Sequence, residues 1–170
     1  FAGATLFVTD ITGRRRMEEA LRQSEARYRT LFESAGDAIF IHDLFPPPGG
    51  DAGHFLAANQ VACQRLGYSL QELMARTPAD IEAPEYAAQL AERIDELQRY
   101  GHHFYETVHV RSDGATIPTE LSSRVMDYEG RAAVLVIARD ITERKQVEQV
   151  LLRTERLSAM GHLAAALAHE

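Results

Sequence analysis

The sequence predicts an α+β domain in which five strands enclose a group of short helices, with a longer helix at each end of the chain. Two observations support this prediction. Apolar residues recur at helical steps of three and four over residues 13–35 and again from residue 143 onward. Between them, the period changes to two over the last three strand-like segments, which the turn pairs Asp113-Gly114 and Glu129-Gly130 separate.

The first longer helix is predicted over residues 13–35, after an apolar β-rich segment. Either Asp10 or Thr12 can cap it, because both side chains can accept a hydrogen bond from the first free backbone N–H groups. Its larger side chains recur at steps of four and three, which is a short heptad seam suited to pairing with a second helix. The seam consists of Met17, Leu21, Ser24, Tyr28 and Leu31.

The first half of the domain combines two strands with short helices. Residues 37–44 and 55–59 are predicted as strands, and the loop between them is irregular because it contains three prolines and three glycines. Two short helices broken at Gly67 follow. Ser69, with Glu72 three residues later, predicts a capping box at the start of the second helix.

A longer helix is predicted over residues 84–100. Pro84 suits its first turn, and Gly101 ends it. Its buried stripe is expected to contain Ala87, Leu90, Ile94 and Leu97. The last three strands follow at residues 103–111, 116–128 and 131–140.

Composition and charge exclude several classes of protein. The chain of 170 residues is 45% apolar and 25% charged, which is typical of a globular domain, and its net charge of −7 argues against nucleic-acid binding. The single cysteine cannot form an internal disulfide and favours a cytoplasmic setting. No apolar run approaches the roughly 20 residues that a membrane span needs. The chain begins with Phe1 instead of methionine, so we expect a longer parent protein, in which a membrane anchor could lie elsewhere.

One phrase occurs twice. "DITGRRRMEEALRQSE" begins at Asp10 and "DITERKQVEQVLLRTE" begins at Asp140, each after an apolar segment and before a stretch of helical composition. Composition alone explains the shared charged residues, but it does not explain why the phrase follows a strand both times. The repeat therefore indicates two domains of one type in series.

The segments "SEARYRTLFESAGDAIFIHD", "AANQVACQRLGYSLQELM", "HVRSDGATIPTELSS" and "VLVIARDITERK" resemble PAS sensor domains. The resemblance implies the PAS fold, a five-stranded antiparallel sheet with helices on one face, flanked here by amphipathic N- and C-terminal signalling helices. It implies four parts: the last strand and exit of an upstream PAS domain (1–12), a linker helix (13–35), a PAS domain (36–142) and a signalling helix (143–170). The signal junction would consist of Asp140, Ile141 and Thr142, with Asp10 and Thr12 in the first copy.

The end of the chain, "RLSAMGHLAAALAHE", resembles the start of the dimerisation and phosphoacceptor helix of bacterial sensor histidine kinases. The resemblance implies that His169 accepts the γ-phosphoryl group of ATP and that Glu170 assists with the proton. Neither GxxxxGK nor GxGxxG occurs, so this chain alone is not expected to phosphorylate anything. ATP and Mg would bind elsewhere in the parent kinase, and a response regulator would be its partner in the phosphorelay.

The predicted function is therefore a signal-sensing and relay module of a two-component sensor histidine kinase. It is expected to form a homodimer through the flanking helices. One alternative is a PAS module that controls a different effector, such as a nucleotide cyclase or a transcription regulator. Another is a PAS domain that serves only for dimerisation.

No cofactor is predicted within the chain. A flavin photosensor of the light-oxygen-voltage type needs a cysteine after the Gly-Tyr-Ser region, but that region reads "MARTPADI" here, and Cys63 lies on an earlier helix. Haem is disfavoured because the helix over 84–100 has no histidine to bind the iron. His42, His54 and His109 are too scattered for a metal site and are interpreted as surface or strand residues.

A modest apolar pocket is expected between the sheet and the helices, with an unidentified small molecule as its ligand. Most of its residues are interpreted as ordinary core. The predicted lining residues are Ile39, Ile41, Val61, Leu66, Leu90, Ile94, Phe104, Ile117, Leu121 and Val136.

Overall fold

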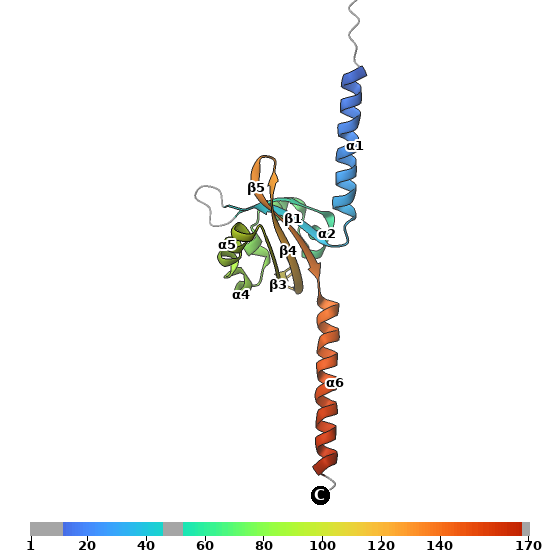
Figure 1. Cartoon of the computed structure of the whole chain (residues 1–170), viewed down its shortest axis with the longest axis vertical. Coiled ribbons are helices and arrows are strands. Elements are labelled where there is room, and N and C mark those ends of the chain that lie inside the picture. The colour runs from blue at the N-terminus through green and yellow to red at the C-terminus, as the bar shows by residue number, and fades with distance from the viewer. Residues whose placement is uncertain (1–11, 46–52, 168–170) are drawn as a thin grey trace, which may run out of the picture. The chain divides into compact units, whose positions relative to one another are not determined.

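The computed structural model describes residues 12–45 and 53–167, with side chains over 13–45 and 53–156. The chain divides into two units: residues 1–35, which contain the first helix, and residues 36–170, which contain the other elements. In chain order the elements are α1 (Thr12–Ser34), β1 (Ala38–Asp43), β2 (Phe55–Ala58), α2 (Gln60–Leu66), α3 (Leu70–Met74), the 3-10 helix η1 (Pro78–Ile81), α4 (Pro84–Ala87), α5 (Leu90–Tyr100), β3 (His102–Val110), β4 (Thr116–Tyr128), β5 (Arg131–Asp140) and α6 (Thr142–Leu167) (Figure 1).

The five strands form one antiparallel sheet in the order β2-β1-β5-β4-β3 (Figure 1). The last strand, β5, lies at the centre, between β1 and β4. Its backbone is therefore hydrogen-bonded along both edges, while Val134, Val136 and Ala138 are buried on one face and Leu135 and Ile137 are partly exposed on the other. The sheet and its helical insert confirm the fold class predicted from the sequence.

The hydrophobic core lies between one face of the sheet and the insert that runs from α2 to α5. Its largest fully buried apolar side chains are Phe40 on β1, Leu66 on α2, Leu73 on α3 and Val134 on β5. Each such side chain contributes roughly 1.5–3 kcal/mol when it leaves water. The core therefore fixes the insert against β1 and β5.

Polar contacts hold α2 at both ends. At its start, the buried Asn59 side chain accepts hydrogen bonds from the backbone N–H groups of Ala62 and Ile39, each at 3.0 Å, which joins the helix to β1. At its end, the Ser112 hydroxyl donates to the Gly67 carbonyl at 2.7 Å. Gly67 has a φ of 75°, and a Cβ atom there would lie 2.6 Å from the Ser112 oxygen, so only glycine fits without a shift.

The continuous helix predicted over 84–100 is wrong in one respect, because the structure breaks it into α4 and α5. Gln89, between them, has φ −93° and ψ 3°, outside the helical range. The carbonyl of Tyr86 accepts a hydrogen bond from the guanidinium of Arg93 as well as one from the Gln89 N–H at 3.0 Å. In a continuous helix, this carbonyl would instead accept a hydrogen bond from the N–H of Leu90.

The two long helices carry apolar side chains that the described chain does not bury. On α1, Met17, Leu21 and Leu31 are 61–74% exposed, and on α6, Val147 and Val150 are 55% and 64% exposed. Within the described residues, no helix combines the length and the apolar character that a membrane crossing requires.

Candidate functional site

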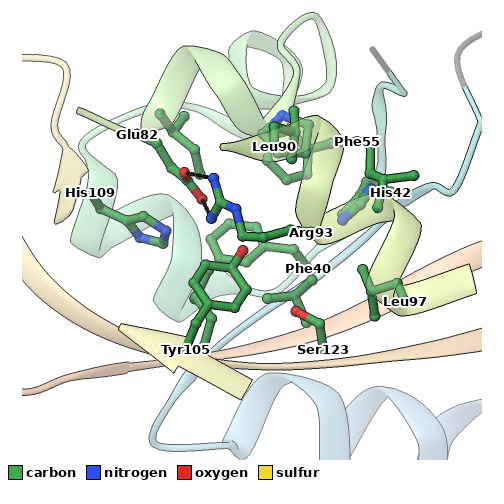
Figure 2. A pocket seen from close by; sticks show the side chains of 15 residues that line it. Phe40, His42, Phe55, Glu82, Leu90, Arg93, Leu97, Tyr105, His109 and Ser123 are labelled. Atoms are coloured by element: carbon green, nitrogen blue, oxygen red, sulfur yellow. Dashed lines mark hydrogen bonds and ion pairs between the residues drawn. The ribbon is translucent and has the colours of Figure 1, made fainter. Parts of the chain in front are cut away.

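An internal cavity of about 30 Å³ lies between the sheet and the insert (Figure 2). Nine of its fifteen lining side chains are apolar: Phe40, Phe55, Pro78, Ile81, Leu90, Ile94, Leu97, Leu121 and Val136. The other six are polar: His42, Glu82, Arg93, Tyr105, His109 and Ser123. An apolar pocket with a few convergent polar groups is the usual form of a small-molecule site.

A buried ion pair occupies one wall of this cavity. Arg93 Nη1 and Nη2 donate to the two carboxylate oxygens of Glu82 at 3.1 Å and 2.6 Å, as the dashed lines in Figure 2 show. The Tyr105 ring lies against the guanidinium, 4.4 Å from its centre to the guanidinium carbon. Burial alone would lower the pKa of Arg93, but its bonds to Glu82 outweigh that effect and raise it. Arg93 therefore stays charged and is neutralised by Glu82.

The third nitrogen of this guanidinium, Nε, has no hydrogen-bond partner among the described residues. Arg93 is 6% exposed, and its Nε–H makes no hydrogen bond in the part of the chain that the structure describes. A buried donor without an acceptor costs about 1–3 kcal/mol. An acceptor atom placed in the cavity beside Nε would remove this cost.

Two buried histidines on the cavity wall are held neutral. Burial, with the positive charges of Arg65 and Arg93, lowers the pKa of His109 to about 4. Burial also lowers the pKa of His42. His42 Nδ1 lies 2.9 Å from the carbonyl of Asp43, which can only accept, so Nδ1 carries the proton and Nε2 keeps a lone pair.

Four of the ten predicted lining residues line the cavity: Leu90, Ile94, Leu121 and Val136. The other six lie elsewhere, which corrects the prediction. Ile39 and Ile41 occupy the opposite face of β1, Phe104 occupies the opposite face of β3, and Ile117 lies nearer the β3–β4 turn. Val61 and Leu66 belong to α2 and pack in the core.

The error on the strands has a physical cause. Both faces of β1 are apolar, so its sequence does not show which face meets the insert. On β3 the inward face is the more polar one, with Tyr105, Thr107 and His109, whereas the apolar Phe104 points outward and is 62% exposed. A prediction based on hydrophobicity therefore placed Phe104 on the inward face of β3, although this side chain points outward.

The polar residues of the cavity were not predicted from the sequence, from which His42 and His109 were interpreted as surface or strand residues. A signal for Arg93 was available, because Arg93 lies three residues after Leu90 and four before Leu97, on the buried stripe of α5. No sequence spacing points to Glu82 as its partner.

The predicted signal junction lies where β5 meets α6. The carboxylate of Asp140 accepts a hydrogen bond from the Thr142 N–H at 2.8 Å. Ile141 is buried, its N–H donates to the Pro118 carbonyl at 3.0 Å, and its carbonyl accepts from the Lys145 N–H at 2.9 Å. These bonds join the first turn of α6 to the end of β5 and to β4.

Charged side chains strengthen this joint. Arg144 donates to Glu120 on β4 at 2.9 Å and to Glu106 on β3 at 2.7 Å, and Lys145 lies 2.6 Å from Glu106. The bond from Lys145 lowers the pKa of Glu106. Glu106 and Glu120 form a cross-strand pair, and two like charges in this position repel each other unless a cation bridges them. Arg144 supplies that cation from α6.

Several predicted site residues cannot be placed. His169, Glu170 and Asp10 lie outside the described residues, as does nearly all of the segment 1–12, and Thr12 begins α1. Among the described residues, no three His, Cys, Asp or Glu side chains gather in a way that could hold a metal ion.

Comparison with known families identifies the chain. A family model described as "PAS domain" matches residues 50–143, which is more than half of the sequence. The chain belongs to the PAS domain family. It is a PAS sensor domain of the kind found in sensor histidine kinases, and the cavity and the junction are features of this PAS domain.

Two curated relatives extend the similarity beyond the PAS domain. The chain is 35% identical to a methyl sulfide methyltransferase-associated sensor from Methanosarcina acetivorans, over 85% of this chain and 14% of the relative. It is 30% identical to sporulation kinase A from Bacillus subtilis, over 97% of this chain and 26% of the relative. The chain thus spans about a seventh and about a quarter of these proteins.

Solved structures share the fold. The PAS domain of an HTR-like protein from Haloarcula marismortui superposes with a TM-score of 0.65 at 26% identity, covering 75% of this chain and 99% of that one. A domain of a sensory box sensor histidine kinase/response regulator from Geobacter sulfurreducens gives a TM-score of 0.58 at 28% identity, covering 71% and 96%.

The buried His109 predicts a loss of stability on mild acidification. In the unfolded chain its imidazole binds a proton near its ordinary pKa of 6.5, but in the fold it stays neutral down to about pH 4. Between these values the unfolded state binds more protons, so the free energy of unfolding falls as the pH falls, by up to about 3 kcal/mol at pH 4. Urea denaturation at a series of pH values measures this slope.

Variants separate the contribution of His109 to the slope between pH 6.5 and pH 4.5 from those of other groups. His109→Gln should reduce the slope, and the slope that remains includes the contribution of the buried His42. The same change at the exposed His54 is the control. A wild-type profile that is already flat in this window would contradict the buried neutral imidazole.

Asp140→Ala is expected to loosen the first turn of α6. Loss of a side-chain acceptor at a helix start costs about 1 kcal/mol, equivalent to roughly fivefold faster opening of that turn. Hydrogen exchange at the Lys145 amide, which bonds to the Ile141 carbonyl, measures the change. Asp95→Ala, at an exposed position on α5, is the matched control. Equal exchange in the wild type and the Asp140 variant would show that the carboxylate does not hold the joint.

Proposed function

We propose that this chain is the signal-input and relay module of a two-component sensor histidine kinase. In this proposal the PAS domain (36–142) senses a signal, and α6 carries the response toward the phosphoacceptor His169. Residues 13–35 act as the linker helix from an upstream PAS domain whose last strand and exit are residues 1–12. The parent protein would bind ATP and Mg in another domain and pass the phosphoryl group to a response regulator.

One structural observation carries the relay part of this proposal. Tyr105 and Leu121 are paired across β3 and β4, and both line the cavity. Their immediate neighbours, Glu106 and Glu120, are also paired, and both bind Arg144 of α6. Successive residues of a strand point to opposite faces. A change in the cavity would therefore reach Arg144 of α6 through these two adjacent residue pairs.

The comparisons support the kinase part. The similarity to sporulation kinase A covers 97% of this chain, and the similarity to sensor histidine kinase TmoS from Ectopseudomonas mendocina covers 94%. Both alignments are longer than the PAS domain, so they include much of the flanking helices. Helix α6 extends to Leu167, about 39 Å from its start at 1.5 Å per residue, and ends two residues before His169.

The proposed reaction is a phosphoryl transfer. A ring nitrogen of neutral His169 attacks the γ-phosphorus of ATP, a nitrogen–phosphorus bond forms, and the bond between the γ-phosphorus and the bridging oxygen breaks, so that ADP leaves. Glu170 accepts the imidazole proton. The Mg²⁺ expected with the nucleotide in the parent kinase would supply charge neutralisation at the phosphate oxygens.

The relay also requires two copies of α6. Val147, Val150 and Leu151 share one side of the helix and are 55–64% exposed. A single helix leaves such a stripe in water, whereas two parallel copies around a two-fold axis bury it. The homodimer through the flanking helices, which the sequence predicts, would thus place two copies of the phosphoacceptor segment side by side.

His169→Gln in the parent kinase is expected to abolish autophosphorylation, because an amide nitrogen cannot act as the nucleophile. Incorporation of phosphate from γ-labelled ATP in an acid-labile form measures the reaction. His102→Gln, a change at an exposed histidine on β3, should retain activity. Thermal unfolding should give equal midpoints for the wild type and both variants. Undiminished labelling of the His169 variant would refute the assignment.

Leu151→Glu is expected to shift the protein from dimer toward monomer, because it places like charges opposite each other in the helix pair. Sedimentation velocity measures the association state. Gln149→Glu adds the same charge on the opposite side of α6 and should leave the dimer intact. If both variants remain dimeric, the dimer does not depend on the α6 stripe.

A further inference from the structure

The charge balance of the cavity indicates which ligands it can accept. Arg93 and Glu82 cancel each other, since the guanidinium binds both carboxylate oxygens. Burial lowers the pKa of His42 and of His109, so both rings are neutral at pH 7. Burial, with the nearby charge of Glu82, raises the pKa of Tyr105, whose hydroxyl therefore stays protonated. The lining thus has polar groups but no net charge.

This neutrality disfavours ions. A charged ligand would lose its hydration on entering and would find no free counter-charge, because the only buried cation and anion of the lining already bind each other. A neutral ligand does not meet this cost.

The unpartnered donor specifies one end of the ligand. Arg93 Nε–H is buried, has no acceptor among the described residues, and belongs to a side chain that lines the cavity (Figure 2). A hydroxyl or carbonyl oxygen can accept its hydrogen bond without carrying charge. The apolar part of the lining, which includes Phe40, Phe55 and Leu121, suits a short alkyl group.

The volume of the cavity limits the size of the ligand. A cavity of about 30 Å³ exceeds the roughly 10–15 Å³ that one water molecule requires by two- to threefold. The ligand therefore has two or three non-hydrogen atoms in the cavity as it stands.

We propose that the cavity selects a small neutral amphiphile, with a short alkyl group and one hydroxyl or carbonyl oxygen that accepts a hydrogen bond from Arg93 Nε. This proposal rests on the proposed sensing role of the PAS domain and names the chemical class of its ligand. It assigns Arg93 two tasks, since two of its nitrogens hold Glu82 and the third binds the ligand.

The test compares three probes of equal size and different charge: ethanol, ethylammonium and formate, each with three non-hydrogen atoms. Each is titrated into the full ¹⁵N-labelled chain at pH 7 and constant ionic strength. The readout is the NMR signal of the Arg93 Nε–H group, assigned from its loss in Arg93→Lys. Ethanol should shift this signal with saturation, with a Kd on the order of 1 mM or weaker, as three atoms allow. Ethylammonium and formate should bind at least tenfold more weakly.

Val136→Leu adds one methylene group to the cavity wall and should abolish the saturable shift. Val110→Leu makes the same change on the outward face of β3, away from the cavity, and should leave the shift intact. If formate or ethylammonium binds as tightly as ethanol, charge selection is wrong. If ethanol gives no saturable shift, the cavity holds only water and the proposal fails.

These outcomes are independent of the phosphotransfer. His169→Gln should bind ethanol as the wild type does, whether or not His169 is the phosphoacceptor. Failure of ethanol binding with intact autophosphorylation would overturn the ligand class alone. The reverse result would overturn the kinase assignment alone.

Discussion

The buried ion pair between Arg93 and Glu82 determines much of the arrangement around the cavity. Neither charge can be removed alone without leaving the other uncompensated, which costs about 3–5 kcal/mol. The pair ties α5 to the segment before α4, and Glu82 in turn forms a β-bridge with His109 of β3. The same guanidinium binds the Tyr86 carbonyl at the break between α4 and α5. The helical insert and the sheet are therefore joined at this ion pair.

The antiparallel pairing of β3 and β4 places two different surfaces one residue apart. Tyr105 and Leu121 face the cavity, while Glu106 and Glu120 bind the cation that α6 presents. Because side chains alternate along a strand, the cavity-facing pair and the cation-binding pair lie on opposite faces of the same two strands. In the proposed relay, these two adjacent pairs connect the interior of the domain to its C-terminal helix.

The flanking helices differ from the domain in what stabilises them. The PAS domain buries its own core, whereas α1 and α6 leave apolar stripes exposed within the described chain. Long single helices in water gain little from propensity alone, and most of their stability comes from packing an apolar face. Association of such helices would therefore couple their order to the presence of a second copy, which suits a module that relays a signal along them.

The sequence by itself determined the order of the strands and the flanking helices, the turns, the capping box at Ser69 and the joint at Asp140, because these depend on residues a few positions apart. It predicted a pocket between the sheet and the helices and four of its apolar lining residues, but no member of the polar lining. The packing of the insert on the sheet decides which face of β1 and of β3 turns inward. It also brings Glu82 into contact with Arg93, eleven residues later in the sequence. Both faces of β1 are apolar and the inner face of β3 is polar, so hydrophobicity does not indicate which face of either strand is buried. Only the tertiary structure decides this.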